Sequence, residues 1–120
     1  MKYLLVSLPD EKAARTPPTP EFLGKMTKFI QAEMKSGVLL ATGGLLPISQ
    51  GGARVRCSSG KFTVVDGPYA ESKELIAGFA IVEVKSREEA IAASRRFYEI
   101  AGEGEGTIQR ILEPGDFGSP

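Results

Sequence analysis

The hydrophobic positions of the chain form short apolar runs, which alternate with longer segments in which apolar residues recur at helical spacing. Residues 2–8 (KYLLVSL) are apolar at both odd and even positions. Alternate residues of a strand point to opposite faces of a sheet, so this run predicts a strand that needs cover on both faces. Similar runs at residues 38–47, 77–84 and 106–113 predict three further strands.

Residues 20–35 and 87–101 have helical spacing instead. Thr19 and Pro20 suit the start of the first helix, and Ser86 with Glu89 forms a capping box at the start of the second. Each helix has one mainly apolar face. These faces comprise Phe22, Met26, Phe29, Ile30 and Met34 in the first helix, and Ala90, Ile91, Ser94, Phe97, Tyr98 and Ala101 in the second.

Residues 53–66 predict a β-hairpin with Ser59 and Gly60 at its tip. This register gives the hairpin one mainly apolar face, on which Cys57 is expected to be an inert core residue, and one basic face. The apolar face carries Val55, Cys57, Phe62 and Val64, and the basic face carries Arg54 and Arg56 beside Thr63 and Val65.

The element order is β-α-β, the hairpin, and then β-α-β. It predicts an α+β, ferredoxin-like domain over residues 1–113, with both helices on one face of an antiparallel sheet and a tail at residues 114–120. The opposite face of the sheet is also apolar and has no helix to cover it. Because such a surface is unusual on a monomer, we expect a homodimer joined through this face.

Composition excludes several classes of function. A net charge of zero gives no electrostatic basis for binding nucleic acid or an anionic membrane. The first apolar run is too short for a signal peptide or a membrane span, and a single cysteine suits a reducing compartment, so we expect a cytoplasmic protein. The absence of histidine removes Ser-His-Asp chemistry and the commonest metal ligand, and we expect no metal or cofactor.

Asp66, Gly67 and Pro68 follow the hairpin and have two readings. They suit a turn, in which Asp66 accepts hydrogen bonds from the following amides. In the predicted register, however, Asp66 lies on the apolar side of the hairpin, where a carboxyl group has a raised pKa unless it is paired. Asp66 is therefore also a candidate catalytic residue. Whether the Gly67–Pro68 bond is cis is open.

Several segments resemble the YCII-related, or DGPF, family. DGPYAESKELIAGFAIVEVKSREEA is similar to the signature written DGPFAETKE, and MKYLLVSL, KSGVLLATGGLLP and GARVRCSSGKFTVVDGP resemble the family's opening strand, second strand and hairpin. The resemblance implies a ferredoxin-like domain of the dimeric α/β-barrel type with largely unassigned activity. Some relatives are suggested to be enzymes because a histidine and an aspartate share a pocket near the dimer interface. Here Asp66 matches, but histidine is absent, and Leu46 and Gly43 occupy positions where the family often has polar residues.

Two hypotheses for function follow, and catalysis is open in both. In the first, a dimer binds a small polar molecule near its interface; Asp66 orients it or accepts a proton, and Arg54, Tyr69 and Lys73 bind it. In the second, the chain is a non-catalytic regulatory module that binds a protein partner. The resemblance implies this partner, because DGPF-family proteins are similar to gene products that are often encoded beside, or fused to, extracytoplasmic-function sigma factors. A scaffold in which residues 66–68 are purely structural is a third reading.

Overall fold

The computed structural model describes residues 1–10, 17–65 and 77–117. Asp66, Tyr69 and Lys73, which the sequence suggests as site residues, lie outside these ranges. The elements are β1 (Lys2–Pro9), α2 (Pro20–Lys35), β2 (Leu39–Leu45), β3 (Arg54–Ser58), β4 (Lys61–Val65), β5 (Ala77–Glu83), α3 (Arg87–Ala101), β6 (Gly104–Arg110) and a 3-10 turn η1 (Pro114–Phe117).

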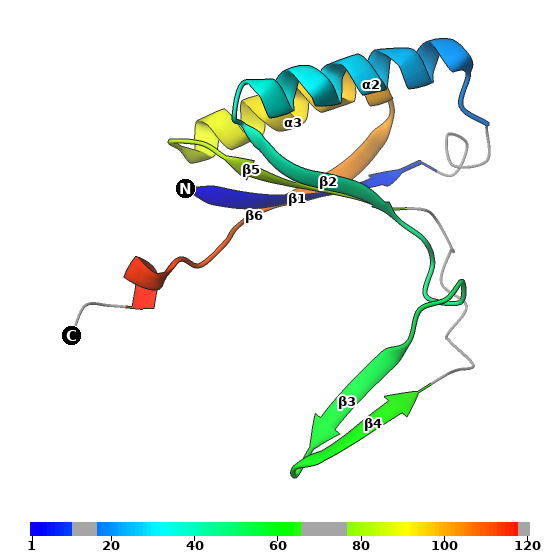
Figure 1. Cartoon of the computed structure of the whole chain (residues 1–120), viewed down its shortest axis with the longest axis vertical. Helices are drawn as coiled ribbons and strands as arrows, with labels where there is room; N and C mark the ends of the chain where they lie inside the picture. The colour runs from blue at the N-terminus through cyan, green and yellow to red at the C-terminus, as the bar shows by residue number, and fades with distance from the viewer. Residues whose placement is uncertain (11–16, 66–76, 118–120) are drawn as a thin grey trace.

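Strands β1, β2, β5 and β6 form an antiparallel sheet in the order β2-β5-β1-β6. Helices α2 and α3 both lie on one face of this sheet (Figure 1). This strand order, with a helix after the first and third strands of the sheet, is the ferredoxin-like arrangement. The predicted fold class is therefore confirmed.

Local sequence signals fix where both helices begin. The Thr19 hydroxyl accepts a hydrogen bond from the Phe22 amide at 3.1 Å, and the Ser86 hydroxyl accepts one from the Glu89 amide at 3.1 Å. Each bond satisfies an amide that the first helical turn leaves without a partner.

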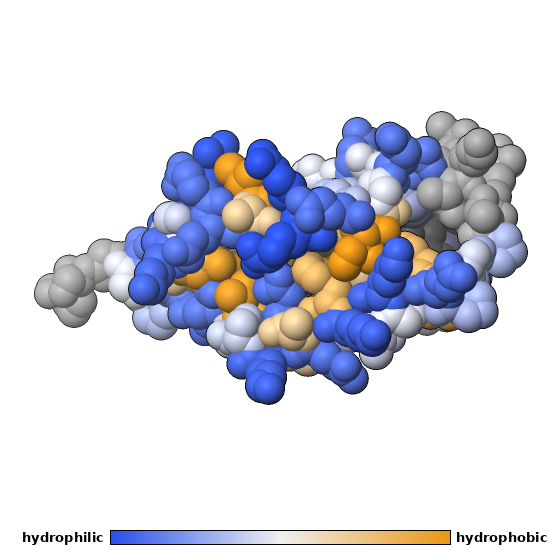
Figure 2. Space-filling model, turned by 90° about the horizontal axis from the view of Figure 1, so that it is seen from above, coloured by the Kyte–Doolittle hydropathy of each residue, from blue (hydrophilic) through white to orange (hydrophobic). Residues whose placement is uncertain are grey.

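Seen from the helix side, the surface is mostly hydrophilic, with apolar side chains showing between the charged ones (Figure 2).

The buried core lies between the helices and one face of the sheet, and it is small. Among the described residues its cluster consists of Tyr3, Leu39, Val82, Val84 and Ala90. Helix α2 contributes no fully buried residue, and Met34, expected on its core face, is exposed. The space under the middle of the helices is therefore incompletely filled by side chains.

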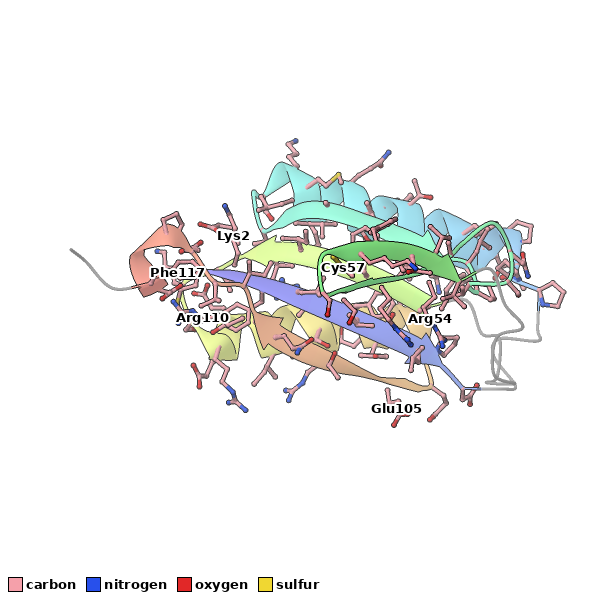
Figure 3. All side chains as sticks on the ribbon, turned by 90° about the horizontal axis from the view of Figure 1, so that it is seen from below. Lys2, Arg54, Cys57, Glu105, Arg110 and Phe117 are labelled. Carbon is pink, nitrogen blue, oxygen red and sulfur yellow. The ribbon has the colours of Figure 1, made fainter. Side chains whose placement is uncertain are left out.

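Strands β3 and β4 pair in the predicted register and form a separate two-stranded sheet. Ser59 and Gly60 have φ angles of 52° and 76°, as a tight type I′ turn requires. The hairpin extends below the main sheet, on the side away from the helices (Figure 1), and overlies that face when viewed from below (Figure 3).

The hairpin is exposed along its whole length in the isolated chain. Cys57, expected in the core, is therefore exposed. The prediction was wrong because the alternating pattern shows which residues share a face, but not whether anything covers that face. Exposed apolar residues on this face include Val55, Phe62 and Val64.

Strand β6 begins two residues earlier than the sequence predicts. The sequence predicts this strand from residue 106, whereas β6 already begins at Gly104. A Cβ atom on Gly106 would lie 2.2 Å from the Val6 carbonyl oxygen, so a side chain does not fit at this point. Beyond β6, Asp116 of η1 accepts a hydrogen bond from Arg110 at 2.6 Å, which fixes the turn to the end of the strand.

Candidate functional site

A row of glycines crosses the helix-facing side of the main sheet. The strand registers place Gly44 of β2, Gly78 of β5, Ser7 of β1 and Gly106 of β6 side by side. Three of these four neighbouring positions have no side chain. The sheet therefore presents bare backbone to the helices at this level, where other layers of a sheet would supply core side chains.

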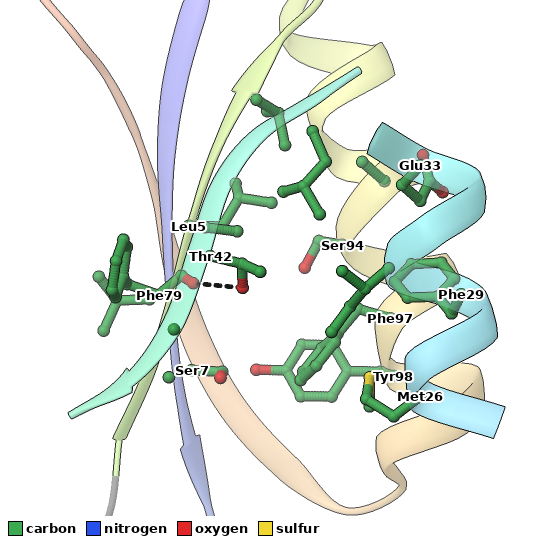
Figure 4. Close-up of a pocket in the computed structure, with 18 of the residues that line it drawn as sticks. Leu5, Ser7, Met26, Phe29, Glu33, Thr42, Phe79, Ser94, Phe97 and Tyr98 are labelled. Carbon is green, nitrogen blue, oxygen red and sulfur yellow. Dashed lines mark hydrogen bonds between the residues drawn. The ribbon is translucent and has the colours of Figure 1, made fainter. Parts of the chain in front are cut away.

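A cavity of about 420 Å³ lies over Gly44, Gly78 and Ser7 of this row, between the sheet and the two helices. Side chains from α2 and α3 cover it, and the rings of Phe97 and Tyr98 meet edge to face with centroids 5.1 Å apart. Most of the wall is apolar (Figure 4). The lining residues used below are Ser7, Thr42 and Gly78 of the sheet, Met26, Phe29 and Glu33 of α2, and Ser94, Phe97 and Tyr98 of α3.

The cavity adjoins a second hollow of about 550 Å³ at the end of the sheet. Ser7, Gly78 and Tyr98 line both spaces, and the second extends to Thr19 at the start of α2 and Ala77 at the start of β5. The two spaces therefore border each other at this end of the sheet.

The Tyr98 hydroxyl is the main polar group inside the cavity. It is buried and has no hydrogen-bond partner within the described ranges. Figure 4 shows it pointing toward the sheet and the Ser7 hydroxyl. Gly106 makes this position accessible, because a Cβ atom there would lie 2.7 Å from the Tyr98 oxygen. A buried hydroxyl without a partner costs about 1–3 kcal/mol, which a bound acceptor would remove.

The surroundings of Tyr98 keep its hydroxyl protonated. Burial raises the pKa of the phenol, and the negative charge of Glu105 raises it further. At neutral pH the group is therefore a hydrogen-bond donor as well as an acceptor. In contrast, the hydroxyl of Thr42 already donates to the carbonyl oxygen of Phe79 at 2.8 Å.

The charged lining residue Glu33 is held by a partner on the other helix. Arg96 of α3 donates two hydrogen bonds to its carboxylate, at 2.5 and 3.2 Å. This hydrogen bonding raises the pKa of Arg96, although partial burial opposes the shift. The pair links α2 to α3 above the cavity, and its bidentate geometry favours that one arrangement of the helices.

Comparisons with known proteins identify the family. The sequence model of the YCII-related domain matches residues 1–111. The chain belongs to the YCII-related family. No curated protein matches it. A solved structure that is similar to this YCII-related chain is the divalent cation tolerance protein (Cut A1) from Thermus thermophilus. The two share 10% sequence identity with a TM-score of 0.43, and the match covers 94% of this chain and 86% of the Cut A1 chain. These values are too low to inform on ligand or activity.

Of the site residues that the sequence of this YCII-related chain suggests, Arg54 lies in the described ranges, and it does not line the cavity. Arg54 is the first residue of β3, is exposed, and pairs with Val65 at the base of the hairpin. Within the described ranges no group of three or more carboxylate, cysteine or histidine side chains could hold a metal ion. No helix in these ranges has the length and apolar character needed to cross a membrane.

Sequence reasoning missed the cavity in the YCII-related chain. The available signal was glycine within runs that otherwise read as strands, at Gly44, Gly78 and Gly106. Their meaning depends on strand register, because only pairing places them in one row beside Ser7. The sequence does not specify that register.

Proposed function

We propose that this YCII-related chain is a homodimeric domain that binds a small molecule in the cavity between its helices and its sheet. The observation that carries the proposal is the Tyr98 hydroxyl, buried without a described partner in a mainly apolar cavity of about 420 Å³. Small-molecule sites are typically apolar spaces of about 300–1,000 Å³ with a few polar groups that orient the ligand.

The surface of the isolated chain supports the dimer. Its accessible surface is 9098 Å², whereas a compact monomer of 12.8 kDa is expected to expose about 6,300 Å². Its radius of gyration is 17.1 Å, against about 13.6 Å for a compact chain of this length. The excess area is larger than the ~800 Å² that each partner buries in a standard interface.

Two surfaces of the described residues contribute to this exposed area, and a second copy could cover both. The projecting hairpin has an exposed apolar face, and the helix-free face of the sheet carries Leu4, Val6, Phe79 and Ile81. An isolated two-stranded hairpin is marginally stable in water and needs further packing. A partner chain that covers the hairpin and the open sheet face supplies this packing.

We also retain, as a separate proposal about a different site, that Asp66, Arg54, Tyr69 and Lys73 bind a small polar molecule in a cleft near the dimer interface. Asp66 would orient the ligand or accept a proton from it, and Arg54 would bind an anionic group. An Asp66→Asn variant that retains both binding and any turnover would contradict this role.

A second candidate function is a non-catalytic regulatory module with a sigma-factor-linked protein partner. The exposed hairpin supports it as a surface that a different protein could bind. Purification from the native host distinguishes the candidates. A stoichiometric protein partner favours the regulatory module, and a bound metabolite favours the small-molecule site.

Native mass spectrometry of the freshly purified protein tests the proposed function. We expect a dimer that carries a reproducible additional mass. Ser94→Phe places a large ring in the cavity and should remove that mass, whereas Ala92→Phe introduces the same ring at an exposed position of the same helix and should not. An additional mass that persists in Ser94→Phe would place the ligand elsewhere.

A further inference from the structure

We infer that the ligand of the cavity is a neutral, planar, mainly apolar molecule whose single hydrogen-bond acceptor, such as a ketone oxygen, meets the Tyr98 hydroxyl. This inference rests on the proposed function, because it names the chemical class that the same cavity would bind. Three properties of the described residues carry it: the shape of the cavity, its charge, and the buried Tyr98 hydroxyl, which has no partner within the described ranges.

The shape of the cavity favours a flat molecule. Its floor includes Gly44 and Gly78 of the glycine row, which expose backbone. Its roof includes the rings of Phe97 and Phe29 (Figure 4). A planar ring system fits between a bare sheet and aromatic side chains and gains both apolar burial and ring contacts.

The charges favour a neutral molecule. Within the described part of the chain, the charged side chain that lines the cavity is Glu33, and Arg96 neutralises it on the helix side. No lysine or arginine among the described residues lines the cavity. A carboxylate or phosphate would lose its hydration without gaining a cationic partner, and Glu105 adds a repulsive charge near Tyr98.

The unpartnered donor favours an acceptor at one defined position. Tyr98 stays protonated at neutral pH, so it can donate to a carbonyl oxygen. A ligand without an acceptor leaves this buried hydroxyl unsatisfied and binds less tightly. The Ser7 hydroxyl, toward which Tyr98 points, offers a second polar contact at the same end of the cavity (Figure 4).

Three naphthalenes of closely similar shape test this class: acetylnaphthalene, ethylnaphthalene and naphthoate. Their dissociation constants are measured by ligand fluorescence with the full-length wild-type chain, Tyr98→Phe, Ser94→Phe and Ala92→Phe. Thr42→Phe fills the cavity from the sheet side and serves as a second filling variant if Ser94→Phe does not fold. Circular dichroism confirms that each variant is folded.

We expect the wild type to bind acetylnaphthalene about five- to tenfold more tightly than ethylnaphthalene, as one hydrogen bond provides. Naphthoate should bind most weakly. Tyr98→Phe should remove the preference for the ketone, and the filling variants should lose all three ligands while Ala92→Phe retains them.

The outcomes separate the two proposals. If the cavity binds these molecules but prefers naphthoate, or if Tyr98→Phe keeps the preference for the ketone, the ligand class is wrong and the cavity site survives. If none of the three binds the wild type, the ligand class is wrong, and the additional mass in native mass spectrometry still decides the cavity function. If both filling variants bind like the wild type, or if Ser94→Phe retains the additional mass, the proposed cavity function itself is wrong.

Discussion

Truncation of Phe62 at the hairpin should strongly weaken the proposed dimer. The Phe62 side chain is 64% exposed in the isolated chain and lies on the apolar face of the hairpin. Complete burial of a phenylalanine contributes about 1.5–3 kcal/mol, so covering the exposed part contributes about 1–2 kcal/mol per copy. A two-fold symmetric dimer buries this residue twice, and Phe62→Ala should therefore cost about 2–4 kcal/mol of dimerisation free energy.

That cost corresponds to an increase of about 30- to 1,000-fold in the dimer dissociation constant. Sedimentation equilibrium over a range of protein concentrations measures it for the wild type and the variant. Leu23→Ala is the matched control, because Leu23 is 51% exposed but lies on α2, on the other side of the sheet. A wild type that sediments as a monomer at micromolar concentration would refute the dimer. Equal dissociation constants for Phe62→Ala and the wild type would remove the hairpin from the interface.

Three further changes test the interior and the C-terminal turn. Tyr98→Phe should raise the unfolding free energy of the ligand-free protein by about 1 kcal/mol in urea denaturation, because it deletes a buried hydroxyl that has no hydrogen-bond partner among the described residues. A loss of stability would show instead that the hydroxyl forms a hydrogen bond in the folded protein. Gly106→Ala should lower the unfolding free energy by about 2–3 kcal/mol, because its Cβ atom would meet a carbonyl oxygen of β1. Gly24→Ala is the control, because Gly24 lies in a helix with open space around it, and this change should raise the unfolding free energy by about 0.5–1 kcal/mol. Similar effects of the two substitutions would contradict the packing at the glycine row. Hydrogen bonds from a backbone amide and from Arg110 lower the pKa of Asp116 in the folded protein. The ionised carboxylate should therefore stabilise the turn above the ordinary carboxyl pKa, and the turn should loosen as the pH falls through the lowered pKa of the folded state. NMR titration of the Asp116 carboxyl group measures this pKa, and a normal or raised pKa would contradict the prediction.

The local signals that specify the fold were readable from the sequence. Thr19 and Ser86 cap the helices as predicted, and the hairpin pairs in the predicted register. The element order also led to the correct strand arrangement, because few topologies place two short β-α-β units in one sheet. These features depend on residues that are close in sequence or on general rules of chain connection.

The candidate site was not readable in the same way. Ser7, Gly78 and Gly106 are far apart in the sequence, and only the pairing of three strands brings them into one row. A shift of one residue in any pairing would turn the glycines toward the other face and close the cavity. Tyr98 was assigned correctly to the inner face of its helix, but the pattern could not show that its hydroxyl would find no partner there.

The domain therefore has two distinct deficits in packing, and they lie on opposite sides of the same sheet. The space over the glycine row is internal and suits a small molecule, whereas the open sheet face and the hairpin are external and suit a second copy. Mass action separates the two contributions, because a ligand present at 100 times its dissociation constant stabilises the folded state by about 2.7 kcal/mol at any fixed protein concentration. Stabilisation by the dimer instead grows with protein concentration in the absence of ligand. Thermal unfolding measured over a range of ligand concentrations, and then over a range of protein concentrations, should therefore show two separate stabilising effects. Phe62→Ala should reduce only the effect of protein concentration, and Ser94→Phe should reduce only the effect of the ligand.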